Sequence, residues 1–232
     1  MNESDRINNV YEDYSSRRYF MNKWSSLNKG NKLINIEKLN LIKSLLELHK
    51  INLKNKKILD VGCAGGDTIN FLKDLGGLEQ DIYGIDIREN RLKHAKENLP
   101  KAKIYHMDAR NINFQDNKFD LVSAFTVFTS VVDINNRKKI SNELVRVLKP
   151  GGIIIFYDFR YNNPFNKSVK GLRRKDIDIL FPNMIKYIHL ITLFPPLARR
   201  LGRFTKSFYS LFSKSKILRT HYSGLIIKAE SY

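Results

Sequence analysis

The chain has 232 residues, which is enough for one domain with a full hydrophobic core and marginal for two. Hydrophobic residues make up 42% and charged residues 28%, the proportions of a soluble globular protein. Because Cys63 is the only cysteine, a disulfide within the chain is excluded, and a reducing cytoplasm is the expected compartment. The polar N-terminus does not resemble a secretory signal, and no stretch has the roughly 20 apolar residues of a transmembrane helix.

The net charge of +18 is unevenly distributed along the chain. Residues 160–232 contain 15 Lys and Arg against 3 Asp and Glu, which gives +12 for the last third. Such an excess can be a solvated surface, or it can serve an anionic membrane, an anionic substrate or nucleic acid.

The first 50 residues are expected to form a helical cap. Residues 1–32 are polar with interspersed aromatic side chains, and residues 34–49 carry apolar side chains at near-helical spacing. A group of tyrosines and arginines in this segment could form a lid over a bound ligand or, equally, one face of a solvated helix: Tyr11, Tyr14, Arg17, Arg18 and Tyr19.

From residue 57 onwards, short apolar runs alternate with helical patterns. Strands are predicted at 57–61, 81–87, 102–106, 119–125 and 153–159, and helices at 68–75, 89–99 and 135–148. This alternation predicts an α/β fold with a doubly wound, mostly parallel sheet and helices on both faces.

The last third is less regular. Its pattern predicts a short helix at 175–180, a sixth strand at 185–193, a basic aromatic helix or helical pair at 198–213, and a closing strand at 222–228. The predicted sheet therefore has seven strands.

A glycine loop follows the first strand and contains Gly62 and Gly66 after Asp60. Glycines between a strand and a helix let a ligand approach the backbone, although a tight turn alone would also use them. Asp86 ends the second strand and can accept both ribose hydroxyls of an adenosine, while Asp108 follows the third strand and can accept from the adenine amine. Each acid alone could be a solvated loop residue, but together they outline an adenosine site.

A dinucleotide-dependent dehydrogenase would share only part of this pattern. Gly62-Cys63-Ala64 lacks the second glycine of the Gly-x-Gly-x-x-Gly motif, and such an enzyme needs no acid after the third strand.

Five segments resemble, in order, the motif series of class I S-adenosylmethionine-dependent methyltransferases with a Rossmann-like fold: ILDVGCAGGDTINFL, GIDI, HMDA, FDLVSAFTVFTSV and ELVRVLKPGGIIIFYDF. The resemblance covers roughly residues 55–160. It implies that the chain binds S-adenosylmethionine and releases S-adenosylhomocysteine. Ala64 stands where the family often has glycine, and its small side chain is compatible with cofactor binding.

The resemblance also implies a role for each motif residue. Asp60, Gly62 and Gly66 would hold the methionine part of the cofactor, in a loop that includes Cys63 and Ala64. Asp86 would hold the ribose, with Ile87 against the adenine. The adenine edge and the sulfonium would be contacted by two further pairs, Asp108 with Ala109 and Phe125 with Thr126.

The flanking segments resemble bacterial methyltransferases associated with surface-polysaccharide biosynthesis: RRYFMNKWSSLNKGN, YDFRYNNPFN, LFPPLARRLG and LRTHYSGLIIK. The implied activity is O-methylation of a sugar, glycan or other small polar acceptor. An anionic or lipid-linked acceptor would suit the basic tail. A single domain is expected, with a cap at 1–50, a cofactor-binding core at 55–160 and an acceptor-side part at 161–232 that includes a basic insertion at 194–220.

Methyl transfer requires an acceptor aligned with the methyl group, and an alcohol acceptor benefits from a general base. Asp158, at the end of the fifth strand, is the first candidate; the alternative is a structural acid paired with Arg160. His221, before the last strand, is the second candidate or a structural histidine. Thr129 could hydrogen-bond the acceptor or cap the next turn.

The absence of several known motifs narrows the range of possible acceptors. The only cysteine lies in the glycine loop rather than in a position to attack a pyrimidine, and Ser123-Ala124-Phe125-Thr126 differs from the Asn/Asp-Pro-Pro-aromatic motif of base-amine methylation. No His/Cys cluster has metal-ligand spacing, so no metal is expected. These gaps favour a small molecule or glycan over nucleic acid. The sequence gives no indication of the oligomeric state.

Two other functions stay open. The basic surface could serve an RNA methyltransferase. Alternatively, residues 184–218 mix Phe, Leu and Ile with Lys and Arg, as in an interfacial helix, and the chain could be a membrane-surface module with a vestigial cofactor site. An insertion that covers the acceptor pocket is the favoured interpretation of this segment, with peripheral membrane contact as the alternative.

Overall fold

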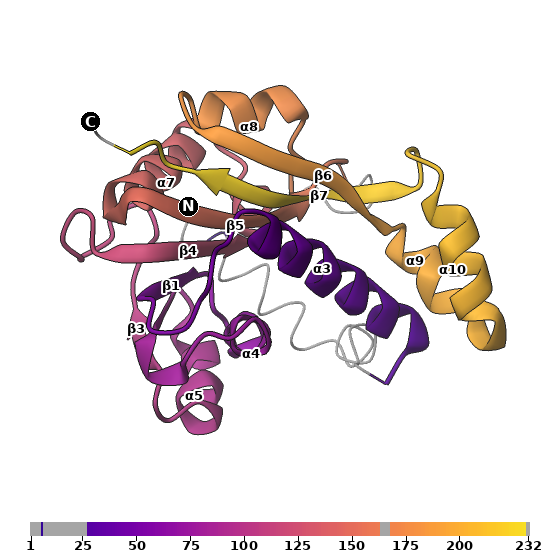
Figure 1. Ribbon diagram of the computed structural model, residues 1–232, viewed down its shortest axis with the longest axis horizontal. Helices are drawn as coiled ribbons and strands as arrows, with labels where there is room; N and C mark the ends of the chain where they lie inside the picture. Colours follow the sequence, from indigo (N-terminus) through magenta and orange to yellow (C-terminus); the bar gives the residue numbers. More distant parts are fainter. Residues whose placement is uncertain (1–5, 7–26, 163–167, 231–232) are drawn as a thin grey trace.

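The computed structural model describes residue 6, residues 27–162 and residues 168–230. The fold is a single sheet with helices on both faces (Figure 1). The strand order is β3-β2-β1-β4-β5-β7-β6. The first five strands pair in parallel, and β7 runs antiparallel to both of its neighbours. The strands are β1 (Ile58–Val61), β2 (Ile82–Asp86), β3 (Lys103–His106), β4 (Phe119–Phe125), β5 (Leu148–Phe159), β6 (Ile185–Leu193) and β7 (Arg219–Ile227). The predicted seven-stranded, mostly parallel fold is confirmed.

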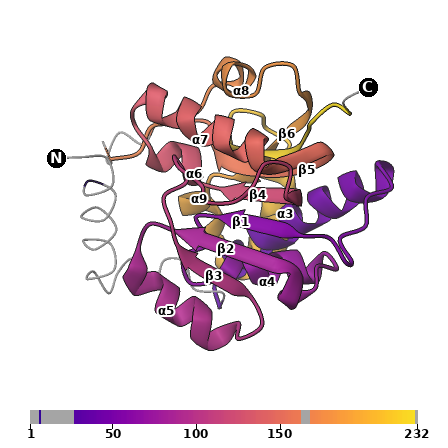
Figure 2. The ribbon, with the colours of Figure 1, turned by 90° about the vertical axis from the view of Figure 1, so that its left-hand side faces the viewer.

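The helices cover the sheet in two layers (Figure 2). One core lies between the sheet and the helices α3 (Lys29–Leu48), α4 (Asp67–Asp74) and α5 (Glu89–Asn98). The other lies between the sheet and the helices α7 (Ile134–Val147) and α8 (Arg174–Leu180). The described segments also include α6 (Val127–Ser130), α9 (Pro195–Arg200), α10 (Thr205–Ser213) and the 3₁₀ turns η1 (Glu79–Asp81) and η2 (Gly202–Phe204).

Local sequence signals explain where several elements begin. The helix predicted from residue 34 begins at Lys29, because the Asn28 side chain caps it by accepting hydrogen bonds from the Gly30 and Asn31 amides. The segment predicted as a helix or helical pair at 198–213 is divided into α9 and α10 by η2, where Gly202 has a φ of 54°. The short helix α6 has no counterpart among the predicted elements.

The connection between β6 and β7, residues 194–218, lies at the carboxyl edge of the sheet. β6 runs in the same direction as β5, and Phe159 and Ile191 are both opposite His221 of β7. The chain therefore leaves β6 at the edge where β1 to β5 also end. Figure 1 shows α9 and α10 of this β6–β7 insertion beyond that end of the sheet. The tyrosines and arginines proposed as a lid, from Tyr11 to Tyr19, lie outside the described residues.

Gly224→Ala is expected to destabilise the sheet. Gly224 has a φ of 155°, and a Cβ atom there would lie 1.8 Å from the Tyr187 carbonyl oxygen of β6. A clash with backbone cannot be relieved by a rotamer change, so we expect a loss of about 3 kcal/mol and a drop in Tm of roughly 6–12 °C. Gly76→Ala is the matched control, since Gly76 also has a positive φ (99°) but open space around the new methyl group. Equal melting temperatures for the two variants would contradict the clash.

Candidate active site

The glycine loop between β1 and α4 turns through left-handed backbone conformations. Gly62 has a φ of 75° and Gly66 a φ of 96°, values that favour glycine. The Gly62 and Cys63 amides both donate to the Ile85 carbonyl oxygen of β2, which holds the loop against the neighbouring strand. Ala64 also has a positive φ, 44°, which explains why glycine suits this position better than alanine. The side chain of Cys63 is buried, and burial raises the pKa of its thiol.

Asp60 is a buried acid beneath this loop. Its Oδ1 accepts a hydrogen bond of 2.6 Å from the Ser123 hydroxyl of β4. Its Oδ2 has no hydrogen-bond partner among the described residues. Burial raises the pKa of Asp60 to about 8; the Ser123 hydrogen bond and Lys38 lower it, and Asp86 raises it further. A buried carboxylate oxygen without a donor suits a ligand that carries a donor or a positive charge.

Asp86 is the last residue of β2, at the same edge of the sheet. Its Oδ2 accepts from the Ala64 amide at 2.9 Å, so this acid also fixes the glycine loop. The Arg88 backbone amide and side chain donate to the same carboxylate, at 2.8 Å and 3.1 Å for Oδ1. Both oxygens of this carboxylate are therefore paired, with the glycine loop and with Arg88.

Asp108 repeats this arrangement after β3. The Arg110 amide donates to its Oδ1 at 2.8 Å, and the Arg110 guanidinium donates to its Oδ2 at 2.5 Å. Ile87 and Ala109 are half-buried beside these acids. The two Asp-x-Arg pairs are a local signal that was present in the sequence and was not used.

Phe125 and Thr126 lie where β4 ends, and the ring of Phe125 lies next to the Lys38 ammonium. The Lys38 ammonium of α3 lies 5.0 Å, 4.9 Å and 5.0 Å from the ring centroids of Phe71, Phe125 and Tyr157. Burial lowers the pKa of Lys38 to about 8, although Asp67 and Asp60 raise it. Because the aromatic rings come from α4, β4 and β5, no local pattern could have revealed this cation site.

The candidate catalytic residues fall on two faces of the sheet. Asp158 is fully buried and accepts from the Phe128 and Thr129 amides, the Thr129 hydroxyl and the Phe159 amide. These contacts hold α6 against the end of β5. Arg160 donates instead to the carbonyl oxygens of Lys216 and Arg219, so no described contact pairs it with Asp158.

His221 lies on the opposite face. Its ring stacks on that of Tyr157, with 4.6 Å between the ring centroids, and its centroid lies 3.9 Å from that of the Phe159 ring. Its Nδ1 lies 2.9 Å from the Thr220 hydroxyl. Burial lowers the pKa of His221 to about 3, so the imidazole is neutral at physiological pH. Asp158 and Thr129 are therefore brought together, and His221 is separated from them; the catalytic role of all three stays a prediction.

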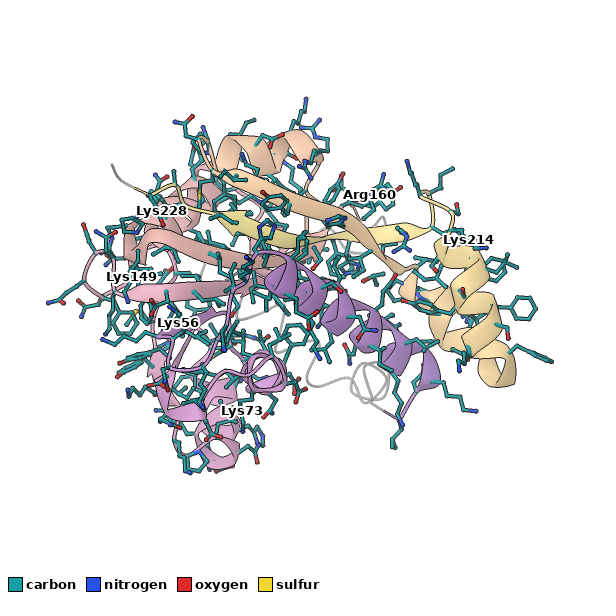
Figure 3. All side chains as sticks on the ribbon, viewed as in Figure 1. Lys56, Lys73, Lys149, Arg160, Lys214 and Lys228 are labelled. Carbon is teal, nitrogen blue, oxygen red and sulfur yellow. The ribbon has the colours of Figure 1, made fainter. Side chains whose placement is uncertain are left out.

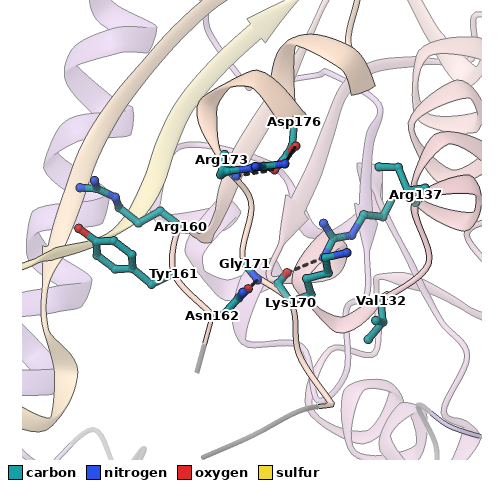
Figure 4. Close-up of a pocket in the computed structure, with 10 residues that line it drawn as sticks. Val132, Arg137, Arg160, Tyr161, Asn162, Lys170, Gly171, Arg173 and Asp176 are labelled. Carbon is teal, nitrogen blue, oxygen red and sulfur yellow. Dashed lines mark hydrogen bonds and ion pairs between the residues drawn. The ribbon is translucent and has the colours of Figure 1, made fainter. Parts of the chain in front are cut away.

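A cavity of about 490 Å³ opens beside the end of β5 (Figure 4). It is lined by the start of α7, the residues that follow β5 and the segment that precedes α8. Thr129 connects to its wall, since the Thr129 carbonyl oxygen accepts from the Lys170 amide at 3.0 Å. Asn162 accepts from the Gly171 amide at 2.9 Å, which shapes the same wall. The charged lining residues are Arg137, Arg160, Lys170, Arg173 and Asp176.

Lysine and arginine side chains lie on both sides of the molecule, but they differ in the groups that compensate their charge. Figure 3 shows Lys56, Lys149 and Lys228 on the side away from α10, Arg160 nearer the middle of the molecule, and Lys214 beside α10. Lys56 and Lys149 both pair with Asp120, and the Lys228 ammonium donates to the Val145 and Leu148 carbonyl oxygens. The last third of the chain carries the larger excess of positive charge.

The carboxyl edge fits S-adenosylmethionine. The buried Oδ2 of Asp60 can accept from the amino group of its methionine part, the glycine loop has left-handed backbone at Gly62 and Gly66, and Asp86 and Asp108 lie at the ends of the next two strands. Residues 59–156 match a family model described as a methyltransferase domain. Residues 59–156 therefore form a methyltransferase domain, and the groups at this edge fit S-adenosylmethionine as its cofactor.

Two similar curated proteins are methyltransferases. Demethylmenaquinone methyltransferase of Staphylococcus epidermidis is 32% identical over 135 residues, 56% of this chain and 55% of that protein. The Staphylococcus aureus protein of the same name is 37% identical over 105 residues, 44% of this chain and 42% of that protein. The chain thus spans about half the length of the curated relatives it matches.

Among solved structures, the fold resembles the N-methyltransferase NodS from Bradyrhizobium japonicum in complex with S-adenosylhomocysteine. The TM-score is 0.68 at 15% identity, covering 97% of this chain and all of NodS. An S-adenosylmethionine-dependent methyltransferase from Mesorhizobium loti gives a TM-score of 0.60 at 14% identity, covering 82% of this chain and all of that one. At these identities the likeness concerns the fold.

None of the described helices is long and apolar enough to cross a membrane. No group of three His, Cys, Asp or Glu side chains in the described part of the chain could hold a metal ion.

Proposed function

We propose that this chain transfers the methyl group of S-adenosylmethionine to a hydroxyl oxygen of a small polar acceptor, a sugar or glycan that carries an anionic group. The observation that carries this proposal is the cavity beside β5, whose lining has four cationic side chains against one acidic one. Cationic and amide groups suit phosphate, carboxylate and hydroxyl groups. A surface-polysaccharide precursor on the cytoplasmic side of the membrane is an acceptor of this class.

The bound cofactor would supply an electrophilic methyl group: its carbon–sulfur bond breaks as a carbon–oxygen bond forms, and the hydroxyl proton leaves to a base. In this proposal Asp60, Gly62 and Gly66 hold the methionine part, and Asp86 and Asp108 hold the ribose and adenine with Ile87 and Ala109. Phe125 and Thr126 border the transferred methyl group. The protein mainly aligns the two reacting atoms.

The pH dependence of methyl transfer would distinguish the two candidate bases. Burial raises the pKa of Asp158 to about 6, and Arg137 is the charged group that lowers it. If Asp158 accepts the proton, kcat rises as the pH increases through about 6 and then levels off, because only the carboxylate can act as a base. If His221 accepts it, kcat shows no inflection between about pH 5 and 8, since the pKa of His221 is about 3. The measurement is kcat against pH for the wild type, Asp158→Asn and His221→Gln.

A role of Asp158 that is only structural would have a different signature. Asp158→Asn would then lower Tm by loosening α6, while the remaining folded enzyme would keep the shape of the wild-type pH profile. A flat wild-type profile together with full activity of His221→Gln would overturn both assignments.

Lys170→Gln is expected to weaken acceptor binding without affecting the cofactor. Lys170 is exposed on the cavity wall, and one lost charge–anion contact should raise the KM for the acceptor about fivefold, with kcat nearly unchanged. Lys175→Gln is the matched control, because Lys175 is an equally exposed lysine nearby that does not line the cavity. Similar KM values in both variants would contradict an anionic acceptor in this cavity.

A quinone acceptor is the second candidate, favoured by the name of the staphylococcal relatives. An acceptor panel separates the two: nucleotide-linked sugars, polyprenyl-phosphate-linked sugars and a demethylated naphthoquinol, each scored by S-adenosylhomocysteine release and by the mass of the methylated product. A product only from the naphthoquinol would replace the sugar proposal. RNA methylation would show instead as steeply salt-dependent RNA binding with a methylated RNA product.

A further inference from the structure

The β6–β7 insertion exposes large apolar side chains. Phe194, Phe208, Leu211 and Ile217 are 46%, 39%, 56% and 79% exposed. Phe208 and Leu211 lie three residues apart on α10 and therefore share one side of the helix. Such a concentration of exposed apolar groups on one element marks an interaction surface.

The same segment is uniformly basic. Residues 194–218 contain six Lys and Arg and no Asp or Glu. Lys206, Lys214 and Lys216 of this segment are also exposed, and Figure 3 shows Lys214 where α10 ends. The surface therefore combines apolar groups with positive charge and no compensating acid of its own.

The inner side of the insertion is firmly attached, so its exposed side is not a packing defect. Leu193, Ala198 and Tyr209 form a small core with Ile34 of α3. The Tyr209 hydroxyl donates to Glu37 of α3 at 2.6 Å. The Arg219 guanidinium, at the start of β7, donates to the other oxygen of the same carboxylate at 2.7 Å. The insertion thus presents its apolar and basic side from a fixed position.

We propose that this surface docks on an anionic lipid bilayer. A bilayer offers anionic headgroups for the lysines and an apolar interior for the phenylalanine, leucine and isoleucine side chains at the same place. A nucleic acid would complement the charge but would leave the aliphatic side chains of Leu211 and Ile217 in water. Charge complementarity together with the apolar exposure therefore selects a lipid surface.

The docking surface adjoins the proposed acceptor cavity. Arg160, which lines the cavity, donates to the Lys216 carbonyl oxygen at 2.9 Å, and the Tyr161 hydroxyl donates to the Ile217 carbonyl oxygen at 3.3 Å. A docked molecule would hold the carboxyl edge of the sheet towards the headgroups. An acceptor carried on a lipid could then enter the cavity without leaving the membrane; this consequence rests on the proposed function, whereas the docking itself does not.

The test is co-sedimentation of the purified full chain with vesicles of phosphatidylcholine alone and of equal parts phosphatidylcholine and phosphatidylglycerol. We expect binding to the anionic vesicles only. Phe208→Ser/Leu211→Ser should lower the partition coefficient about tenfold or more, because both side chains lose their apolar burial. Lys206→Gln/Lys214→Gln/Lys216→Gln should also weaken binding. Ile179→Ser, an equally exposed isoleucine on α8, is the control that should bind like the wild type.

Three outcomes would overturn the proposal: no sedimentation of the wild type with anionic vesicles, unchanged sedimentation of Phe208→Ser/Leu211→Ser, or a wild-type dimer that this variant converts to a monomer. The last would mean that a second copy of the chain covers the surface. Calorimetric binding of S-adenosylhomocysteine to each variant provides an independent check. Intact cofactor binding without vesicle binding would reject the docking surface, and vesicle binding without cofactor binding would reject the proposed reaction.

Discussion

Asp86→Ala should weaken the binding of S-adenosylhomocysteine by about 100-fold or more. Two ribose hydroxyls that donate to one carboxylate form charge-assisted hydrogen bonds, and losing both costs about 3–4 kcal/mol, or roughly 100- to 1000-fold in Kd. The same substitution removes the acceptor for the Ala64 amide, so the glycine loop also loses a contact. Isothermal titration calorimetry of the wild type and the variant is the measurement.

Two controls make this result specific. Asp74→Ala removes an exposed acid at the end of α4 and should leave the affinity unchanged. Thermal melts without ligand would show whether Asp86→Ala still folds. A folded Asp86→Ala protein with the affinity of the wild type would place the ribose elsewhere, and a wild type without any binding would favour the vestigial-site alternative.

Asp60→Asn is expected to stabilise the cofactor-free protein and to weaken cofactor binding. The pKa of Asp60 is about 8 in the fold, against an ordinary value of 3.8, so the folded state binds the proton more tightly than the unfolded chain does. The resulting stabilisation is complete below about pH 4 and is lost progressively as the pH rises through about 8. The neighbours that set this pKa are Ser123, Asp86 and Lys38.

Asparagine has no charge to bury, so the variant should lack this pH dependence. At pH 7 the difference in the free energy of unfolding should be about 3–4 kcal/mol, or roughly 10 °C in Tm. S-adenosylhomocysteine should stabilise the wild type more than the variant, because its amino group compensates the Asp60 carboxylate. Melting curves from pH 5 to pH 8, with and without S-adenosylhomocysteine, provide the test; parallel pH slopes in the two proteins would contradict it.

These two acids have opposite environments at one sheet edge. Asp86 is satisfied by the Ala64 amide and by Arg88 in the absence of ligand, while one oxygen of Asp60 is left without a partner among the described residues. A site of this kind trades stability for affinity, since the group that is costly to bury is also the one that a cationic ligand would compensate.

The cofactor site could be predicted from the sequence because its signals are local. Each proposed contact lies within a few residues of the carboxyl end of a strand, and parallel strands place all these ends on one edge. The acceptor side offered no comparable pattern. Lys170, Arg173 and Tyr161 reach the cavity from separate segments, and none of them was singled out.

The sequence by itself determined the βα alternation and the edge of the sheet at which Asp60, Asp86 and Asp108 lie, because these depend on spacing along the chain. Only the tertiary structure decided that Asp158 and His221 lie on opposite faces of the sheet and that Lys38 lies among three aromatic rings. It also decided that the β6–β7 insertion has an anchored inner side and an exposed basic, apolar outer side. The physical reason is that these features depend on which strands and helices pack together over long separations in sequence.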